Sequence, residues 1–189
     1  LPLQHINDGV LRRMARRVSR HDTLQLIDRL RTGIANLTLR TTFITGFPGE
    51  TDAAFDELAA FVRRQRFERM GVFSYSREEN TPADRLGGHV PEATREERRQ
   101  ALMEIQQRIA FAANEAQIGQ RKTVLVDRPV PDAPGAWIAR SAADAPDIDG
   151  LVFLTENDQH KLSPGAMTEC EIVTFQEYDL IAVATGTPW

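Results

Sequence analysis

The sequence predicts an α/β fold in the longer first part of the chain, followed by a small five-stranded antiparallel β-barrel. Strand-like and helix-like stretches alternate over residues 1–121, which is typical of βα units that build a parallel sheet. After Gly119 the apolar period changes from helical spacing to alternation, and turn residues separate short strand-like stretches. We therefore expect two domains, residues 1–121 and residues 122–189.

Composition indicates a globular protein. Of 189 residues, 41% are hydrophobic and 26% are charged, and no apolar run is long enough to cross a bilayer. A signal peptide is not evident, so we expect a cytoplasmic location and no membrane partner. The single cysteine, Cys170, excludes an internal disulfide and agrees with a reducing compartment.

The net charge of −4 is unevenly distributed along the chain. Residues 1–121 carry 19 Lys and Arg against 16 Asp and Glu, whereas residues 122–189 carry 4 against 11. Proteins that bind nucleic acid through its phosphates need a basic face. We therefore expect the second domain to bind a basic partner rather than nucleic acid, with a merely solvated acidic surface as the alternative.

The beginning of the chain is expected to hold the end of a strand and one helix. Residues 1–4 form a short apolar run that ends at Gln4 like a strand, and there is no initial methionine. We expect the chain to be the later part of a longer protein. Residues 11–20 are rich in arginine, which indicates either a solvated surface or an arginine that binds a carboxylate. Apolar spacing then predicts a helix over Thr23–Gly33.

The centre of the chain is a strand, a tight turn and a helix. Alternation predicts a buried strand over Leu39–Thr45, and Gly46-Phe47-Pro48-Gly49 provides the turn. Thr51 or Asp52 can cap the following helix. Ligands of α/β proteins bind at the carboxyl ends of strands, so we expect this turn beside any site. It lacks the lysine of a phosphate loop and the spacing of a dinucleotide fingerprint, and an ordinary strand-to-helix corner is the alternative.

A further strand is predicted over Phe67–Ser76, and a long helix is predicted from Thr94, where a capping box begins, to Gly119. We expect the polar face of this helix to be solvated. Cys170 has the spacing of a packed core residue. The strands expected in the barrel are Lys122–Arg128, Ala136–Arg140, Ile148–Thr155, Thr168–Phe175 and Tyr178–Thr185.

Several long motifs occur in an order that resembles one enzyme family. The string Arg40–Thr51 (RTTFITGFPGET) is similar to the fifth-strand signature of radical-SAM methylthiotransferases. Pro2–His5, Leu11–Arg16, Gly71–Ser76 and Asp144–Gly150 resemble the RimO type of that family. The resemblance implies that the chain is the C-terminal part of such an enzyme. It would then hold the end of a radical-SAM barrel, which is similar to a TIM barrel, and a TRAM domain, a barrel of the oligonucleotide-binding kind.

The same resemblance implies a function and binding residues. Enzymes of this type methylthiolate the β-carbon of an aspartate in small-subunit ribosomal protein twelve. By position in the motifs, Gln4 would bind the ribose of S-adenosyl-L-methionine (SAM), and Arg16 its carboxylate. Ile44 and Gly46 would contact the adenine edge. None of these residues is expected to be catalytic.

The family also uses two [4Fe–4S] clusters, which cysteines hold in a three-cysteine loop and in an upstream domain. Those cysteines are absent from this chain, so we expect no metal ligand in it and no activity of the chain alone.

The loop Asp144–Gly150 concentrates negative charge. The order of ligands in a calcium-binding EF-hand is absent, and an acidic hairpin with no partner is one interpretation. The sharper hypothesis is that Asp144, Asp147 and Asp149 bind a basic ribosomal protein as substrate.

Two other functions are open at this point. The tRNA-adenosine methylthiotransferases of the same superfamily typically have Gln-Ser-Gly-Ser where this chain has Gln4-His5-Ile6-Asn7, and the acidic second domain opposes RNA binding. A non-catalytic module that binds ribosomes or RNA would also lack the cluster cysteines.

Overall fold

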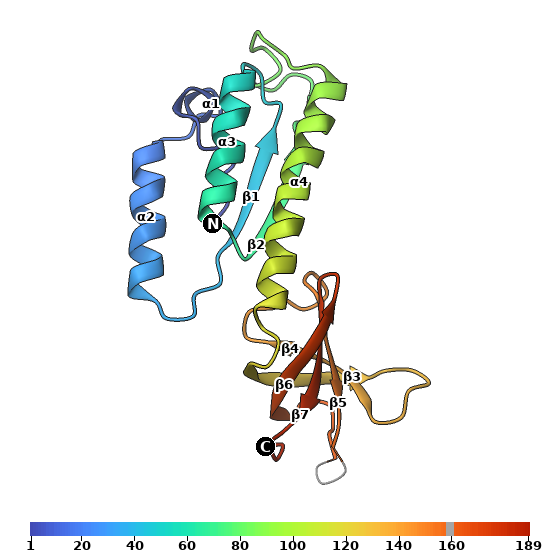
Figure 1. Ribbon diagram of the computed structural model, residues 1–189. Coiled ribbons are helices and arrows are strands. Elements are labelled where there is room, and N and C mark those ends of the chain that lie inside the picture. Colours follow the sequence, from blue (N-terminus) through green and yellow to red (C-terminus); the bar gives the residue numbers. More distant parts are fainter. Residues whose placement is uncertain (158–160) are drawn as a thin grey trace. The chain divides into compact units, whose positions relative to one another are not determined.

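The computed structural model describes residues 1–157 and 161–189 (Figure 1). Contacts divide the chain into two compact units, Leu1–Ile109 and Ala110–Trp189. The division falls inside α4 (Glu92–Glu115), whose last turns pack with the second unit. The expected domain boundary at residue 121 stays a prediction. No helix among the described residues is both long enough and apolar enough to cross a membrane.

The first unit is built on a parallel pair of strands, β1 (Arg40–Thr45) and β2 (Arg69–Ser74), in which Arg40 lies opposite Arg69 and Thr45 opposite Ser74. The predicted run Leu1–Gln4 forms one parallel bridge, between Gln4 and Phe43, rather than a strand. Pro2 has no amide hydrogen to donate and Gln4 has a φ of 68°, so the extended pairing cannot propagate.

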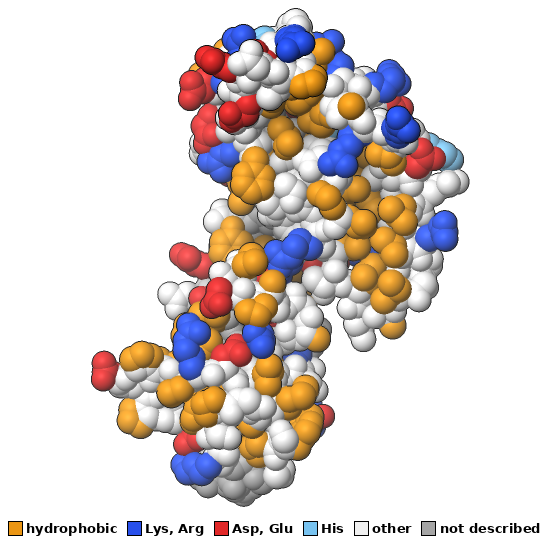
Figure 2. Space-filling view, turned by 180° about the vertical axis from the view of Figure 1, so that it is seen from behind, with side chains coloured by type: hydrophobic (Ala, Val, Ile, Leu, Met, Phe, Trp, Pro, Cys, Tyr) orange, Lys and Arg blue, Asp and Glu red, His pale blue; other side chains and the backbone are white. Residues whose placement is uncertain are grey.

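Helices cover one face of this sheet (Figure 1). Phe43 of β1 packs with Leu58 of α3 (Asp52–Gln65) and Leu102 of α4, and all three side chains are fully buried. On the other face, Ile44 lies opposite Phe73, whose side chain is 62% exposed. Hydrophobic side chains on the surface of the first unit are visible in Figure 2.

The helix ends follow local capping chemistry. Thr51 caps α3, as predicted, because its side chain accepts a hydrogen bond from the Ala54 N–H. The helix predicted from Thr23 is α2 (Arg20–Gly33), which begins earlier because Ser19 and Asp22 form a capping box. A short helix, α1 (Asp8–Arg13), starts at the Asn7 cap.

The predicted start of α4 at Thr94 is wrong by two residues. The helix begins at Glu92, directly after Pro91, whose carbonyl accepts the hydrogen bond of the Arg95 N–H. Pro91, rather than Thr94, is therefore the residue that precedes the first helical residue. A proline is tolerated there because an N–H at the start of a helix has no partner within the helix.

The second unit contains a closed barrel in the order β3-β4-β5-β7-β6, which confirms the predicted five-stranded barrel. Its strands are β3 (Arg121–Pro129), β4 (Ala136–Ser141), β5 (Val152–Thr155), β6 (Met167–Gln176) and β7 (Asp179–Ala184). The expectation that all pairs are antiparallel needs a correction, because β5 and β7 run parallel. A ring of five strands cannot alternate in direction all the way round, so closure requires at least one parallel pair.

The barrel interior is apolar. Val126, Leu154, Ile172 and Ala182 are at most 1% exposed, and Cys170 is fully buried among them, as its spacing predicted. Burial raises the pKa of the Cys170 thiol to about 11, because a thiolate is disfavoured away from water. This cysteine is a packing residue of the core.

Candidate functional site

The carboxyl ends of β1 and β2 and the segment around Gln4 meet at one edge of the first unit. Gln4 donates its N–H to the Thr42 carbonyl and accepts from the Ile44 N–H, both at 2.8 Å. The Tyr75 N–H donates to the Thr45 carbonyl at 2.9 Å. Three segments that are distant in sequence therefore converge beside the turn that follows β1.

Two glycines make the turn possible. Gly46 and Gly49 have φ values of +72° and +88°, which L-residues with a side chain rarely adopt. A Cβ on Gly46 would lie 2.0 Å from Cγ of Arg95, and one on Gly49 would lie 2.4 Å from Nε of Arg13. Two arginine side chains therefore lie directly on the turn.

Both arginines also donate hydrogen bonds to backbone carbonyls of neighbouring segments. Arg13 donates through Nε to the Pro48 carbonyl at 2.7 Å and through its guanidinium to the Gly87 carbonyl. The Gly49 N–H donates to the Gly88 carbonyl at 2.7 Å, which fixes the Gly87-Gly88 loop against the turn. Arg95 donates to the Tyr75 carbonyl at the end of β2.

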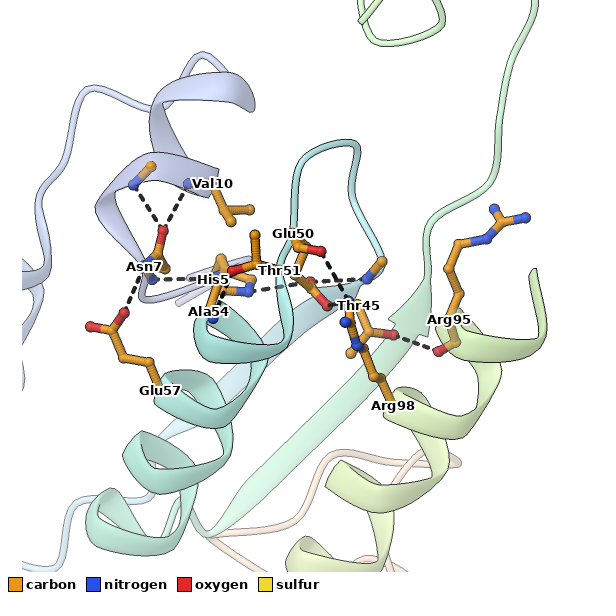
Figure 3. A network of polar contacts seen from close by, with 12 residues as sticks. His5, Asn7, Val10, Thr45, Glu50, Thr51, Ala54, Glu57, Arg95 and Arg98 are labelled. Atoms are coloured by element: carbon orange, nitrogen blue, oxygen red, sulfur yellow. Dashed lines mark hydrogen bonds and ion pairs between the residues drawn. The ribbon is translucent and has the colours of Figure 1, made fainter. Parts of the chain in front are cut away.

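Glu50 is the centre of a buried polar network (Figure 3). Its side chain is fully buried, and Oε2 accepts a hydrogen bond from the Gly46 N–H at 2.9 Å. Oε1 accepts from Arg98 of α4 at 2.7 Å. The Arg98 guanidinium, 8% exposed, also donates to the Glu50 carbonyl and to Asp52. A buried carboxylate needs such a cation, because an unpaired charge away from water is very costly.

His5 contacts the same carboxylate from the other side. Its Nδ1 accepts the Asn7 N–H at 2.9 Å, so the ring proton of a neutral His5 must be on Nε2. Nε2 lies 3.3 Å from Glu50 Oε2, and both side chains are fully buried. The alignment falls short of a good hydrogen bond, and the contact is electrostatic in character.

The structure brings Gln4, Ile44 and Gly46 together at this edge, as the SAM-binding prediction requires. Gln4 Oε1 is a buried acceptor without a hydrogen-bond partner among the described residues, and a polar ligand group would satisfy it. Ile44 is half-buried. Gly46 is buried, its N–H is bonded to Glu50, and the Arg95 side chain lies against its Cα. These features fit the nucleoside part of SAM.

Arg16 is not placed with this group by any contact that the structure describes. Its side chain is exposed, and its backbone N–H donates to the Leu11 carbonyl at 2.9 Å. A guanidinium on a flexible stem can reach a ligand carboxylate from the surface, so Arg16 stays a prediction.

The described residues of this chain do not fit an iron–sulfur cluster. No three His, Cys, Asp or Glu side chains within residues 1–157 and 161–189 are grouped so that they could hold a metal ion. Cys170, the single thiol, is sealed inside the barrel.

Sequence reasoning missed the arginines of this site. The polar face of α4 was expected to be solvated, but Arg98 is buried against Glu50 because α4 packs along the end of β1. The position of Glu50 in the sequence could have predicted a cationic partner. A buried glutamate directly after the Gly46-Phe47-Pro48-Gly49 turn needs a cation from another element.

The loop Asp144–Gly150 of the second unit uses most of its carboxylates internally. Asp144 Oδ2 accepts from the Ser141 N–H and hydroxyl at 3.0 and 2.6 Å. Asp149 Oδ2 accepts from the Ala145 N–H at 2.7 Å. Asp147 is exposed, with a φ of 59°. Of the three predicted substrate-binding residues, Asp147 is therefore the one presented to solvent.

Comparisons with known proteins agree with both units. A family profile for the TRAM domain matches residues 118–185. Three similar proteins are each named ribosomal protein uS12 methylthiotransferase RimO. The one from Lachnoclostridium phytofermentans is 41% identical over 97% of this chain and 41% of its own length. The one from Syntrophotalea carbinolica is 47% identical over 96% and 39%, and the one from Syntrophus aciditrophicus is 43% identical over 100% and 41%.

The chain spans about two fifths of the length of these relatives. Nearly the whole chain is thus similar to part of the RimO-type methylthiotransferases, which confirms the resemblance carried by its sequence motifs.

Proposed function

We propose that this chain is part of a methylthiotransferase that modifies the β-carbon of an aspartate in a small-subunit ribosomal protein. The observation that carries the proposal is identity of 41–47% over at least 96% of the chain with proteins named for action on uS12. A cytoplasmic location would follow from a ribosomal substrate.

In this proposal the first unit contributes part of a SAM site. Gln4 would accept a hydrogen bond from the ribose, and Ile44 and Gly46 would pack against the adenine. Arg16 would bind the carboxylate. The buried Gln4 Oε1, which lacks a partner among the described residues, supports this role.

SAM and two [4Fe–4S] clusters would supply the radical chemistry when bound. Cysteines outside this chain would hold the clusters, because Cys170 alone cannot. We therefore propose that the chain alone is inactive.

The second unit would bind the basic substrate. Residues 122–189 carry 4 basic against 11 acidic side chains, which favours attraction to an Arg- and Lys-rich protein. Asp147 would contact that protein directly, whereas Asp144 and Asp149 would hold the loop in shape through their hydrogen bonds to Ser141 and Ala145.

The test uses the longest natural polypeptide that contains this chain, with its clusters reconstituted and SAM and sulfide supplied. We expect mass spectrometry to find a methylthio group on an aspartate of the ribosomal protein and none on tRNA. Modification of tRNA adenosine alone would establish the other branch of the superfamily. Failure to modify either substrate would favour a non-catalytic binding module.

The assignment of the SAM edge is tested in the same protein. Gln4→Ala should weaken SAM binding by about fivefold, the size of one lost hydrogen bond. Gln25→Ala, which removes the same side chain from the exposed surface of α2, should leave the affinity unchanged. Equal affinities of both variants would remove Gln4 from the site.

The substrate surface has a matched pair of variants. Asp147 and Asp132 are both exposed and both have a φ of 59°. Asp147→Asn should weaken binding of the basic ribosomal protein and flatten its salt dependence, and Asp132→Asn should do neither. Equal effects would mean that only the overall charge of the unit matters.

A further inference from the structure

We infer that His5 and Arg98, acting through Glu50, are positioning residues that hold the two strand ends of the proposed SAM site in register. This inference rests on the proposed function, because it concerns how the binding edge formed by Gln4 and Gly46 keeps its shape. It adds to that function a set of buried side chains that do not touch the ligand.

The first argument is the weakness of the pairing that the network supports. Gln4 is joined to β1 by one isolated bridge, with the two hydrogen bonds to Thr42 and Ile44. A single bridge fixes a backbone far less firmly than a ladder does. Some other interaction must therefore hold Gln4 at a constant distance from Gly46.

The second argument is that one carboxylate reaches both ends. Glu50 Oε2 accepts the Gly46 N–H at 2.9 Å and lies 3.3 Å from Nε2 of His5, the residue next to Gln4. The ring of His5 is itself oriented by the Asn7 N–H on Nδ1. Displacement of Glu50 would therefore shift the amide of Gly46 and release the ring that follows Gln4.

The third argument is how firmly Glu50 is held. Arg98 donates to its Oε1 at 2.7 Å and to its carbonyl at 3.2 Å, and it donates to Asp52 at 2.5 Å. The guanidinium also lies 5.4 Å from the centre of the Phe55 ring. With its donors directed in this way, Arg98 allows one orientation of the carboxylate.

Stability alone does not explain this cluster. A buried ion pair contributes little compared with apolar residues of similar volume, because desolvation offsets the attraction between the charges. The pair does define a unique arrangement of neighbouring groups. Since the side chains of His5 and Glu50 are fully buried, they cannot touch a substrate, and a role in positioning is what their geometry supports.

Two substitutions of His5 separate its two contacts. In His5→Gln, the side-chain amide nitrogen can occupy the position of Nε2 and donate to Glu50, while the acceptor for Asn7 is lost. In His5→Asn, the amide oxygen can occupy the position of Nδ1 and accept from Asn7, while the contact with Glu50 is lost. Both variants remove one contact from the same buried position.

SAM affinity, measured by equilibrium dialysis in the reconstituted enzyme, then tests the inference. We expect His5→Asn to weaken SAM binding by about tenfold and His5→Gln to stay within about twofold of the unsubstituted protein. Thermal midpoints without SAM should fall by similar amounts in both variants, because each loses one buried contact. If affinity follows the thermal midpoint rather than the contact with Glu50, the inference is overturned.

A spectroscopic readout does not depend on SAM. The amide proton of Gly46, bonded to a carboxylate, should resonate downfield in the NMR spectrum of the 189-residue chain. Glu50→Gln should move it upfield, since the neutral amide cannot accept from Gly46 and Arg98 without turning its NH2 group toward another donor. An unchanged Gly46 resonance in a folded Glu50→Gln variant would contradict the network.

The outcomes distinguish the two proposals. If SAM binds and Gln4→Ala weakens it while the two His5 variants behave alike, the positioning inference fails and the proposed function stands. If the reconstituted protein does not bind SAM at all, both fail. Should Glu50→Gln not fold, the comparison of the His5 variants decides alone.

Discussion

The two units bury different kinds of side chain. The described part of the first unit buries seven polar or charged residues, and that of the second buries two. Those of the first unit are His5, Thr23, Thr41, Thr45, Glu50, Arg98 and Gln106, and those of the second are Asn114 and Thr168. The strands of the barrel form backbone hydrogen bonds around a closed ring, and apolar side chains fill its interior. The open sheet carries a buried polar network at the ends of its strands.

This difference indicates which side chains stabilise each unit and which buried groups contribute little to its stability. Apolar packing supplies the barrel with free energy and requires no exact partner for each group. The network around Glu50 gains little net free energy but fixes the backbone of one edge. The buried network of His5, Glu50 and Arg98 lies at the edge of the first unit where we propose the SAM site, whereas the described part of the second unit buries two polar residues.

The largest expected effect tests the apolar character of the barrel. Ile172 is fully buried and its neighbour Val173 is 44% exposed. Ile172→Ala should lower the free energy of unfolding of the second unit by about 2–5 kcal/mol. Val173→Ala should change it by less than about 0.5 kcal/mol.

Tryptophan fluorescence provides the measurement, because Trp137 and Trp189 both belong to the second unit. Denaturant titrations followed by fluorescence should show the loss in Ile172→Ala. Equal midpoints for the two variants would mean that the barrel does not depend on this core.

A somewhat smaller effect is expected at the turn of the first unit. Gly46→Ala would place a methyl group 2.0 Å from Cγ of Arg95 at a φ of +72°. Overpacking and backbone strain together should cost about 3 kcal/mol and should displace Arg95 from the end of β2. Gly119 also has a positive φ, of +79°, but has open space around it.

Gly119→Ala therefore isolates the strain and should cost only about 1 kcal/mol. Denaturation followed by the helical circular dichroism signal measures the cost of Gly46→Ala, alongside SAM affinity, and denaturation followed by tryptophan fluorescence measures that of Gly119→Ala in the second unit. If the two substitutions cost the same, the contact between Arg95 and Gly46 contributes nothing, and the turn is an ordinary corner.

Sequence reasoning worked best where local chemistry decides the structure. The turn from Gly46 to Gly49, the Thr51 cap and the change of period after Gly119 each depend on a few adjacent residues, and all three are present. The presence of a parallel pair in the barrel could also have been predicted, because closure of five strands demands at least one, although not that it is β5–β7.

The partners of Glu50 could not be predicted in the same way. Arg98 lies 48 residues further along the chain and His5 lies 45 residues earlier, and their contacts exist only once the helices and strands have packed. The apolar pattern of α4 fixes which face is buried, but Arg98 borders that face, where pattern alone cannot separate a solvated arginine from a paired one. The loop aspartates show the converse, since Asp144 and Asp149 are recruited by backbone amides of their own turn.

The expected effect that is smallest near neutral pH is the dependence of the second unit's stability on the ionisation of its thiol. Cys170 is the single thiol of the chain, and its pKa rises from 9.0 to about 11 in the folded barrel. In the unfolded chain the thiol loses its proton first, so the native state binds more protons between these values. This contribution of the thiol to the stability of the second unit should therefore be fully present below pH 9 and should decline as pH rises toward 11.

Cys170→Ala should remove this part of the decline, and the difference between the two fluorescence-detected stability curves measures it. Parallel curves would show that the folded and unfolded thiols ionise alike, which the full burial of Cys170 in the apolar core of the barrel contradicts. Alkylation at neutral pH gives the same test in another form, because a thiol held protonated inside the barrel should react only after the second unit unfolds.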